Sequence, residues 1–206
     1  NFMETPLYRC TQPELYAVAR TGWASFAANL AAFTDYRGYY LAPYGTTALA
    51  AIDAAEALPD AQARYANTEV YRTELITLAD TCLARWQTLK RYIVTSFPEA
   101  AQKARLEEAG ALRYEKARGY NWEELRMMNV SAVNFLTTHD AALSAGDNMP
   151  PSFPGSYSVD IEAFANKMQQ FLNSEEQGII DTNAKITANN EVYSTLINMF
   201  KDGQEI

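Results

Sequence analysis

The chain has 206 residues, of which 48% are hydrophobic and 20% charged, with 17 basic and 25 acidic side chains and a formal net charge of −8. These values exclude an intrinsically disordered chain and are typical of a globular protein with its own core. Nine glycines and eight prolines are too few for a collagen-like repeat or a turn-rich all-β fold. We therefore predict an all-α protein with a single domain over residues 1–206.

The first predicted helices cover residues 12–57 and are interrupted by a loop at 37–45. Thr11 and Glu14 have the spacing of a capping box, and apolar residues then recur every three or four positions up to about residue 36. Two glycines and a proline break this pattern in the loop before an alanine-rich helix begins.

Residues 60–97 carry the strongest helical pattern of the chain. This segment contains no glycine or proline, and its apolar residues keep a 4-3 spacing on one face: Tyr71, Leu75, Leu78, Cys82, Trp86, Leu89, Ile93 and Phe97. A helix of this extent is about 57 Å long at 1.5 Å per residue. It needs partners of similar length, either from within the chain or from another copy.

Residues 98–145 have high helical propensity, with a break near Gly119. Gly119 followed by Asn121 reads as a helix stop and a new N-cap. The pattern leaves open whether this segment is one kinked helix or two.

A loop at 146–157, with three prolines and two glycines, precedes the last predicted helix at 158–201. Apolar residues of this helix follow a heptad register, and three polar residues interrupt its seam: Glu175, Thr182 and Asn189. Polar seam positions often fix register or partner number, so we expect an unusual contact there. The alternative is that they lie at the edge of the seam and reach water.

Together these segments predict an elongated up-down-up-down bundle of very long helices with coiled-coil-like seams. The alternative is a six-helix array in which 98–118 and 121–145 pack as an independent hairpin.

Residue patterns of common enzymes are missing from the chain. It contains no G-x-S-x-G elbow, no phosphate-binding G-x-x-x-x-G-K-[ST] loop and no G-x-G-x-x-G turn. The single histidine, His139, cannot supply the two Glu-x-x-His pairs of a di-iron site, and Cys10 and Cys82 lack zinc-ligand spacing. We therefore expect no catalytic residues, no metal and no cofactor, and the sequence does not decide whether Cys10 and Cys82 pair.

The positive signals are apolar and aromatic residues in the two loops. They are Tyr39, Tyr40 and Tyr44 in the first loop, and Met149, Phe153 and Tyr157 in the second. Tyrosine joins a large apolar face to a polar tip, which suits the recognition of peptides, sugars or protein surfaces. The other possibility is that these side chains fold back and seal the bundle.

We therefore predict a non-enzymatic interaction or scaffold protein that acts through helix faces and the two loops, with a protein partner or as a homo-oligomer. One alternative is a module whose loops form a pocket for a small or peptide ligand, and another is an enzyme that uses carboxylates or His139. The segment 146–206 has nine acidic and three basic side chains, which argues against binding to nucleic acid. No apolar run is long enough for membrane insertion.

The first residues give an expectation about location. If Asn1 and Phe2 are foreign residues before a native start at Met3, the protein has no cleaved leader, and we expect it in the cytoplasm. The alternative is a mature secreted chain, which would have the same first residues.

Overall fold

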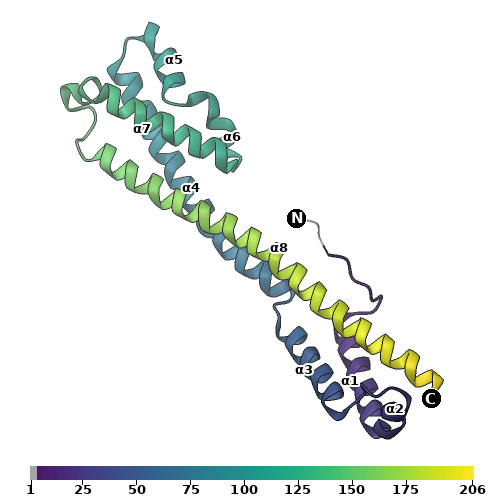
Figure 1. Ribbon diagram of the computed structural model, residues 1–206. Helices are drawn as coiled ribbons and strands as arrows, with labels where there is room; N and C mark the ends of the chain where they lie inside the picture. The colour runs from purple at the N-terminus through teal and green to yellow at the C-terminus, as the bar shows by residue number, and fades with distance from the viewer. Residues whose placement is uncertain (1–3) are drawn as a thin grey trace. The chain divides into compact units, whose positions relative to one another are not determined.

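The structure is a computed structural model that describes residues 4–206, so the expectation about Met3 lies outside the described residues. Between residues 4 and 206 the protein is all-α, with helices α1 to α8, two short 3-10 helices and no strand (Figure 1). None of the helices described is both long and apolar enough to cross a membrane.

The chain divides into two compact units, each with its own hydrophobic core. The terminal unit consists of Asn1–Ala66 and Glu175–Ile206, and the central unit consists of Asn67–Ser174. That the whole chain is a single domain stays a prediction.

The terminal unit contains α1 (Gln12–Ala28), α2 (Leu30–Tyr36), α3 (Ala42–Ala57) and the last part of α8 (Phe153–Glu205). The predicted capping box of Thr11 and Glu14 is present. The predicted helix to residue 36 is broken at Asn29, which leaves the helical region at φ −116° and ψ 24°. The first loop is also shorter than predicted, because α3 begins at Ala42. Pro43 fits its first turn, where a missing N–H is no loss.

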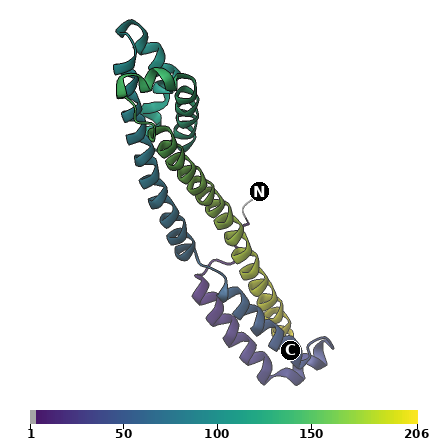
Figure 2. The same cartoon turned by 90° about the vertical axis from the view of Figure 1, so that its left-hand side faces the viewer.

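Helices α1 and α3 run antiparallel, side by side, in both Figure 1 and Figure 2. Gly22 of α1 allows α8 to come close, since a Cβ at this position would lie 2.8 Å from Leu196 Cδ1 of α8.

At the other end of the unit, Lys185 of α8 is only 4% exposed, and its ammonium stabilises the C-terminal end of α3. Lys185 Nζ donates to the carbonyl oxygens of Ala55, Leu58 and Glu56 at 2.7, 2.9 and 3.2 Å.

The central unit contains most of α4 (Ala61–Ser96), then α5 (Glu99–Glu108), α6 (Tyr114–Arg118), α7 (Trp122–Ser144) and the first part of α8. The prediction of one helix over 60–97 is confirmed to within one residue at each end. Its predicted apolar face is buried or half-buried throughout, with Leu75, Leu89 and Ile93 fully buried. Within this unit, α4 and α8 lie side by side (Figures 1 and 2).

The segment 98–145 is not one kinked helix. It is divided at Gly110, where φ is +100°, and again before Asn121, which caps α7 as predicted. A 3-10 helix, Ala111–Arg113, joins α5 to α6, and both α5 and α6 pack on α7. The six-helix alternative describes this part of the chain better, except that the hairpin is not independent. Its buried residues belong to the same core as those of α4 and the first part of α8.

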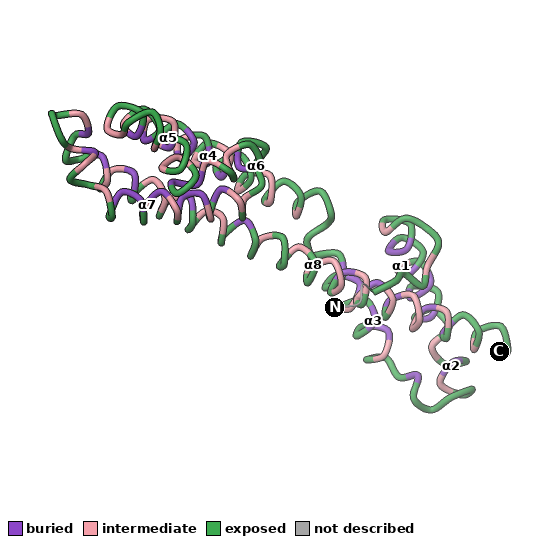
Figure 3. Tube along the Cα trace, turned by 90° about the horizontal axis from the view of Figure 1, so that it is seen from above, coloured by how far each residue is buried: buried purple, intermediate pink, exposed green. Residues whose placement is uncertain are grey.

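The second loop is shorter than predicted, because the 3-10 helix Ala145–Asp147 follows α7 and α8 begins at Phe153. At its other end α8 continues past the predicted end at residue 201 to Glu205. Figure 3 shows buried and exposed residues alternating along α7 and α8, as expected for amphipathic helices.

One of the two apolar rows predicted for α8, that of Leu172, Ile179 and Ile186, is displaced by one residue. The other row, that of Ile161, Met168 and Leu196, is buried or half-buried as predicted. The displaced row has its buried members one residue earlier, at Phe164, Phe171, Lys185, Val192 and Met199, with the half-buried Gly178 between Phe171 and Lys185. In the predicted row, Leu172 and Ile179 are 41% and 47% exposed. Burial of Lys185 explains the error, since a lysine is almost never fully buried unless it is paired.

A buried polar cluster in the central unit makes its stability depend on pH. Tyr157 Oη donates to Asn129 Oδ1 at 3.0 Å, and burial raises the pKa of Tyr157 well above its ordinary value of 10.0. Burial likewise raises the pKa of Cys82 from 9.0 to about 12. The folded state keeps both groups protonated at a pH where the unfolded chain releases their protons. Stability should therefore be fully present below pH 9 and fall as the pH rises above it.

Denaturant unfolding followed by circular dichroism between pH 7 and 11 checks this prediction. The variant Tyr157→Phe should lose about 1 kcal/mol at pH 7, because it removes a buried hydrogen bond, but should show a weaker decline above pH 9. The control Tyr65→Phe alters a tyrosine that is 67% exposed and should keep the wild-type decline. Equal declines for the wild type and Tyr157→Phe would contradict the prediction.

Candidate functional site

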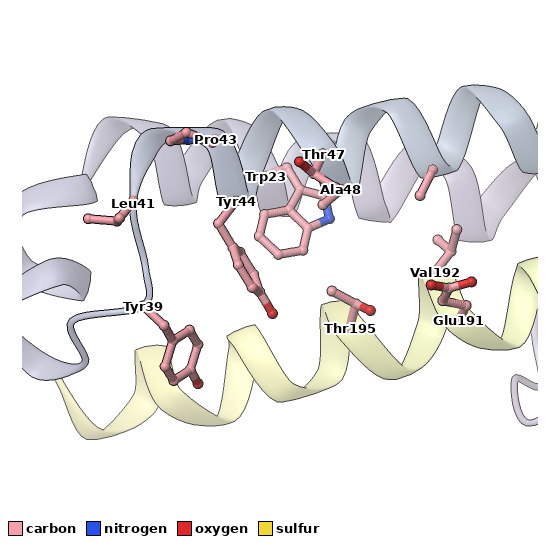
Figure 4. Close-up of a pocket in the computed structure, with 11 residues that line it drawn as sticks. Trp23, Tyr39, Leu41, Pro43, Tyr44, Thr47, Ala48, Glu191, Val192 and Thr195 are labelled. Carbon is pink, nitrogen blue, oxygen red and sulfur yellow. The ribbon is translucent and has the colours of Figure 1, made fainter.

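The strongest candidate site is a groove in the terminal unit, between α3 and the last part of α8, with α1 behind it (Figure 4). Its volume is about 420 Å³, within the range of roughly 300–1,000 Å³ typical of ligand sites. Its lining is largely apolar, with hydroxyls and one carboxylate among the side chains. The lining residues are Trp23, Tyr39, Leu41, Pro43, Tyr44, Thr47, Ala48, Ala51, Glu191, Val192 and Thr195.

Three aromatic residues form the wall at one end of the groove. The ring centroid of Tyr44 lies 5.8 Å from that of Trp23 and 5.8 Å from that of Tyr39. Trp23 belongs to the core and is 1% exposed, whereas Tyr39 is 51% exposed and reaches the groove from the first loop. The wall therefore combines a fixed buried ring with an accessible one.

Asp202 of α8 holds the first loop in place. Its Oδ2 accepts hydrogen bonds from Tyr40 Oη at 2.6 Å and from Tyr39 Oη at 3.2 Å, and its Oδ1 forms an ion pair with Arg37 at 3.0 Å. The hydrogen bond from Tyr40 is the main reason why the pKa of Asp202 is lowered. These bonds fix the position of Tyr39, so the wall of the groove is preorganised.

Several polar groups of the groove have no partner among the described residues, among them the indole N–H of Trp23 and the carboxylate of Glu191. Trp23 Nε1–H has no hydrogen-bond acceptor there, whereas the indole of Trp86, in the central unit, donates to Ala109 O at 2.8 Å. Glu191 is exposed and has no ion pair or hydrogen bond with the described side chains. In Figure 4 the nitrogen of Trp23 lies on the side of the ring nearer to Val192 and Glu191.

The charge around this groove is negative. The terminal unit has twelve acidic and six basic side chains, and no basic residue lines the groove. Arg20 pairs with Asp53 and Glu56, while Arg37 and Lys185 are bonded as described above. The unpaired carboxylate of Glu191 thus lies in an acidic environment.

The structure separates the loop residues predicted for binding. Tyr39 and Tyr44 line the groove, whereas Tyr40 is 1% exposed and packs between Phe26, Phe33 and its neighbouring tyrosines. The three residues of the second loop lie in the core of the central unit: Met149, Phe153 and Tyr157. The two loops therefore belong to different units.

Sequence reasoning missed Trp23, Thr195 and Glu191 as groove residues. Trp23 belongs to the apolar positions that recur every three or four residues in the first helix, but this period gives no sign that the apolar face borders a groove.

The three polar seam residues have different environments. Glu175 is exposed, and the hydroxyl of Thr182 donates to Gly178 O at 2.7 Å, as serine and threonine often do within helices. Asn189 is fully buried, where its Oδ1 accepts from Tyr16 Oη at 2.6 Å and its Nδ2 donates to Tyr8 Oη at 3.0 Å. Asn189 thus fixes the N-terminal segment and α1 against α8.

The residues considered for catalysis or metal binding have other contacts. His139 lies at a break in the α7 helical geometry, with Nε2 3.0 Å from Glu108 Oε1 and its ring against Phe135. Both cysteines are free, with Cys10 exposed and Cys82 buried. Across residues 4–206, no group of three or more histidine, cysteine, aspartate or glutamate residues is arranged to hold a metal ion.

Comparison of the chain with protein-family models, curated proteins and solved structures finds no match.

Proposed function

We propose that this protein is a non-enzymatic interaction protein whose groove between α3 and α8 receives an aromatic residue from a short segment of a partner protein. The observation that carries this proposal is the aromatic wall of Trp23, Tyr44 and Tyr39 in a groove of about 420 Å³. Of the two loops considered for binding, the first is the one that supports this proposal, because the aromatic residues of the second loop are buried.

Physical reasons favour an aromatic side chain as the occupant. Aromatic rings prefer offset or edge-to-face contacts with centroids about 4.5–7 Å apart, and such pairs contribute beyond the area that they bury. Tyr39 and Tyr44 present such ring faces, and Asp202 already holds Tyr39 in place. Because these side chains are already ordered in the free protein, binding of a ligand costs them little conformational entropy.

Protein NMR with a neutral probe tests the proposal. N-acetyl-tryptophanamide, titrated into ¹⁵N-labelled protein, should shift the Trp23 indole signal and the amide signals of Val192 and Thr195. The Trp86 indole signal, in the central unit, should stay unchanged. Absence of any shift at the groove up to the solubility limit of the probe would contradict the proposal.

Substitutions in the wall provide a matched comparison. The double change Tyr39→Ser with Leu41→Ser removes two side chains that are 51% and 54% exposed, so the fold should survive and probe affinity should fall at least fivefold. The control Leu49→Ser removes an apolar side chain of α3 that is 37% exposed and outside the groove, and should leave the affinity unchanged.

Self-association, the other partner predicted from the sequence, is a separate proposal. Light scattering of the purified protein tests it, with a stable oligomer as the expected result and a monomer at all concentrations as the contrary one.

A further inference from the structure

We infer that the groove selects a peptide segment in which an aromatic residue has a lysine or arginine within two positions of it. This inference rests on the proposed function and names the class of segment that the site takes. Two groups of the groove carry it: the unpaired carboxylate of Glu191 and the unpaired indole N–H of Trp23.

The carboxylate of Glu191 gives the groove a preference for a cation. It is the one charged group of the lining, it has no partner among residues 4–206, and the surrounding unit has an excess of acidic side chains. A basic side chain at this position gains an ion pair without breaking an existing one. An acidic side chain meets like charge, which disfavours binding.

The indole of Trp23 gives the groove a donor for a peptide carbonyl. Trp23 lines the groove, and its Nε1–H has no acceptor among the described residues. The nitrogen is accessible at the groove, since the buried side-chain nitrogen without a partner in the described part of the chain is Asn129 Nδ2 of the central unit. A peptide bond lying along the groove supplies an acceptor for this N–H, whereas an aromatic hydrocarbon does not.

The positions of these groups set the spacing in the ligand. Thr195, beside the aromatic wall, and Glu191 are four residues apart on α8, a rise of about 6 Å along the helix. Figure 4 shows both side chains on the side of α8 that faces the groove. An extended peptide advances about 3.3 Å per residue, so a long basic side chain one or two positions from the aromatic anchor spans this distance.

Capped tripeptides of matched size test the inference. The probes are acetyl-Trp-Gly-Lys-amide and the same peptide with Gln or Glu in place of Lys, together with acetyl-Lys-Gly-Trp-amide for the opposite chain direction. The dissociation constants follow from shifts of the Trp23 and Thr195 signals at low salt. In at least one direction, the Lys peptide should bind about two- to fivefold more tightly than the Gln peptide, and the Glu peptide most weakly. The preference should shrink as salt is added.

Variants of Glu191 separate the charge effect from other causes. Glu191→Gln should abolish the preference for the Lys peptide while keeping affinity for the Gln peptide, and Glu191→Lys should favour the Glu peptide. Glu176→Gln removes an exposed carboxylate of α8 outside the groove and should keep the wild-type preference.

The outcomes distinguish this inference from the proposed function. Equal affinities for the three peptides, or a preference that survives in Glu191→Gln, would overturn the inference while the groove still binds an aromatic residue. If no peptide shifts the groove signals, both the inference and the proposed function are wrong.

Discussion

Replacing Leu75 by aspartate should unfold the central unit. Leu75 is fully buried in α4, within the core that α4 shares with α7 and the first part of α8. A carboxyl group there has no partner for its charge, and the change also removes a large apolar side chain. We expect a loss of about 4 kcal/mol or more, a large fraction of the stability of an ordinary domain.

The indole NMR signals of the tryptophans provide the measurement. Trp86 and Trp122 lie in the central unit and Trp23 in the terminal unit, so loss of native dispersion at Trp86 reports on the central unit directly. Leu75→Ala should keep the fold with a loss of about 2–5 kcal/mol. Val70→Asp, on the same helix but 57% exposed, should change the stability by no more than about 0.5 kcal/mol. A folded Leu75→Asp protein with wild-type stability would contradict the assignment of this face to the core.

Replacing Gly110 by alanine should have the second largest effect. Gly110 ends the turn after α5 with φ at +100°, a conformation that is unfavourable for residues with a Cβ. An added Cβ would also lie 3.1 Å from the backbone oxygen of Met128 in α7 and 3.2 Å from its Cα, and backbone atoms cannot move aside as a side chain does. We expect the two effects together to destabilise the protein by about 2–4 kcal/mol.

Gly146 offers a matched control in the same unit. Its φ is +65°, but a Cβ there would meet nothing within 4 Å. Gly146→Ala should therefore show only the backbone effect, about 1 kcal/mol. Denaturant unfolding gives both values, and the difference between them measures the close approach of α7 to Gly110. Equal losses of unfolding free energy for the two variants would show that the close approach of α7 to Gly110 does not constrain the turn.

The sequence predicts the long regular helices well, because periodicity reports directly on one buried face. The apolar face of α4 is correct nearly to the residue, and the caps at Thr11 and Asn121 are present. The prediction from sequence fails where a tertiary contact determines which residue of a helix is buried. One of the two apolar rows of α8 is displaced by one residue because Lys185, bonded to the end of α3, occupies a core position that a periodicity argument assigns to an apolar residue.

The candidate site was only partly predictable for a similar reason. Tyr39, Tyr40 and Tyr44 are alike in sequence, and whether a ring lines a groove or fills the core depends on contacts with Asp202 and Phe26, which lie far away in the chain. Composition identifies the loop as aromatic. It cannot show which ring faces solvent, nor that Glu191 of another helix completes the groove.

The division of the chain has a consequence for the order of folding during synthesis. The central unit is one continuous segment, whereas α1 and α3 of the terminal unit pack on a part of α8 that follows more than a hundred residues later. Both helices therefore leave the ribosome long before the strip of α8 that covers their apolar faces is made. In the interval those faces are open to chaperones, and the central unit is synthesised and completed before the last part of α8 is made.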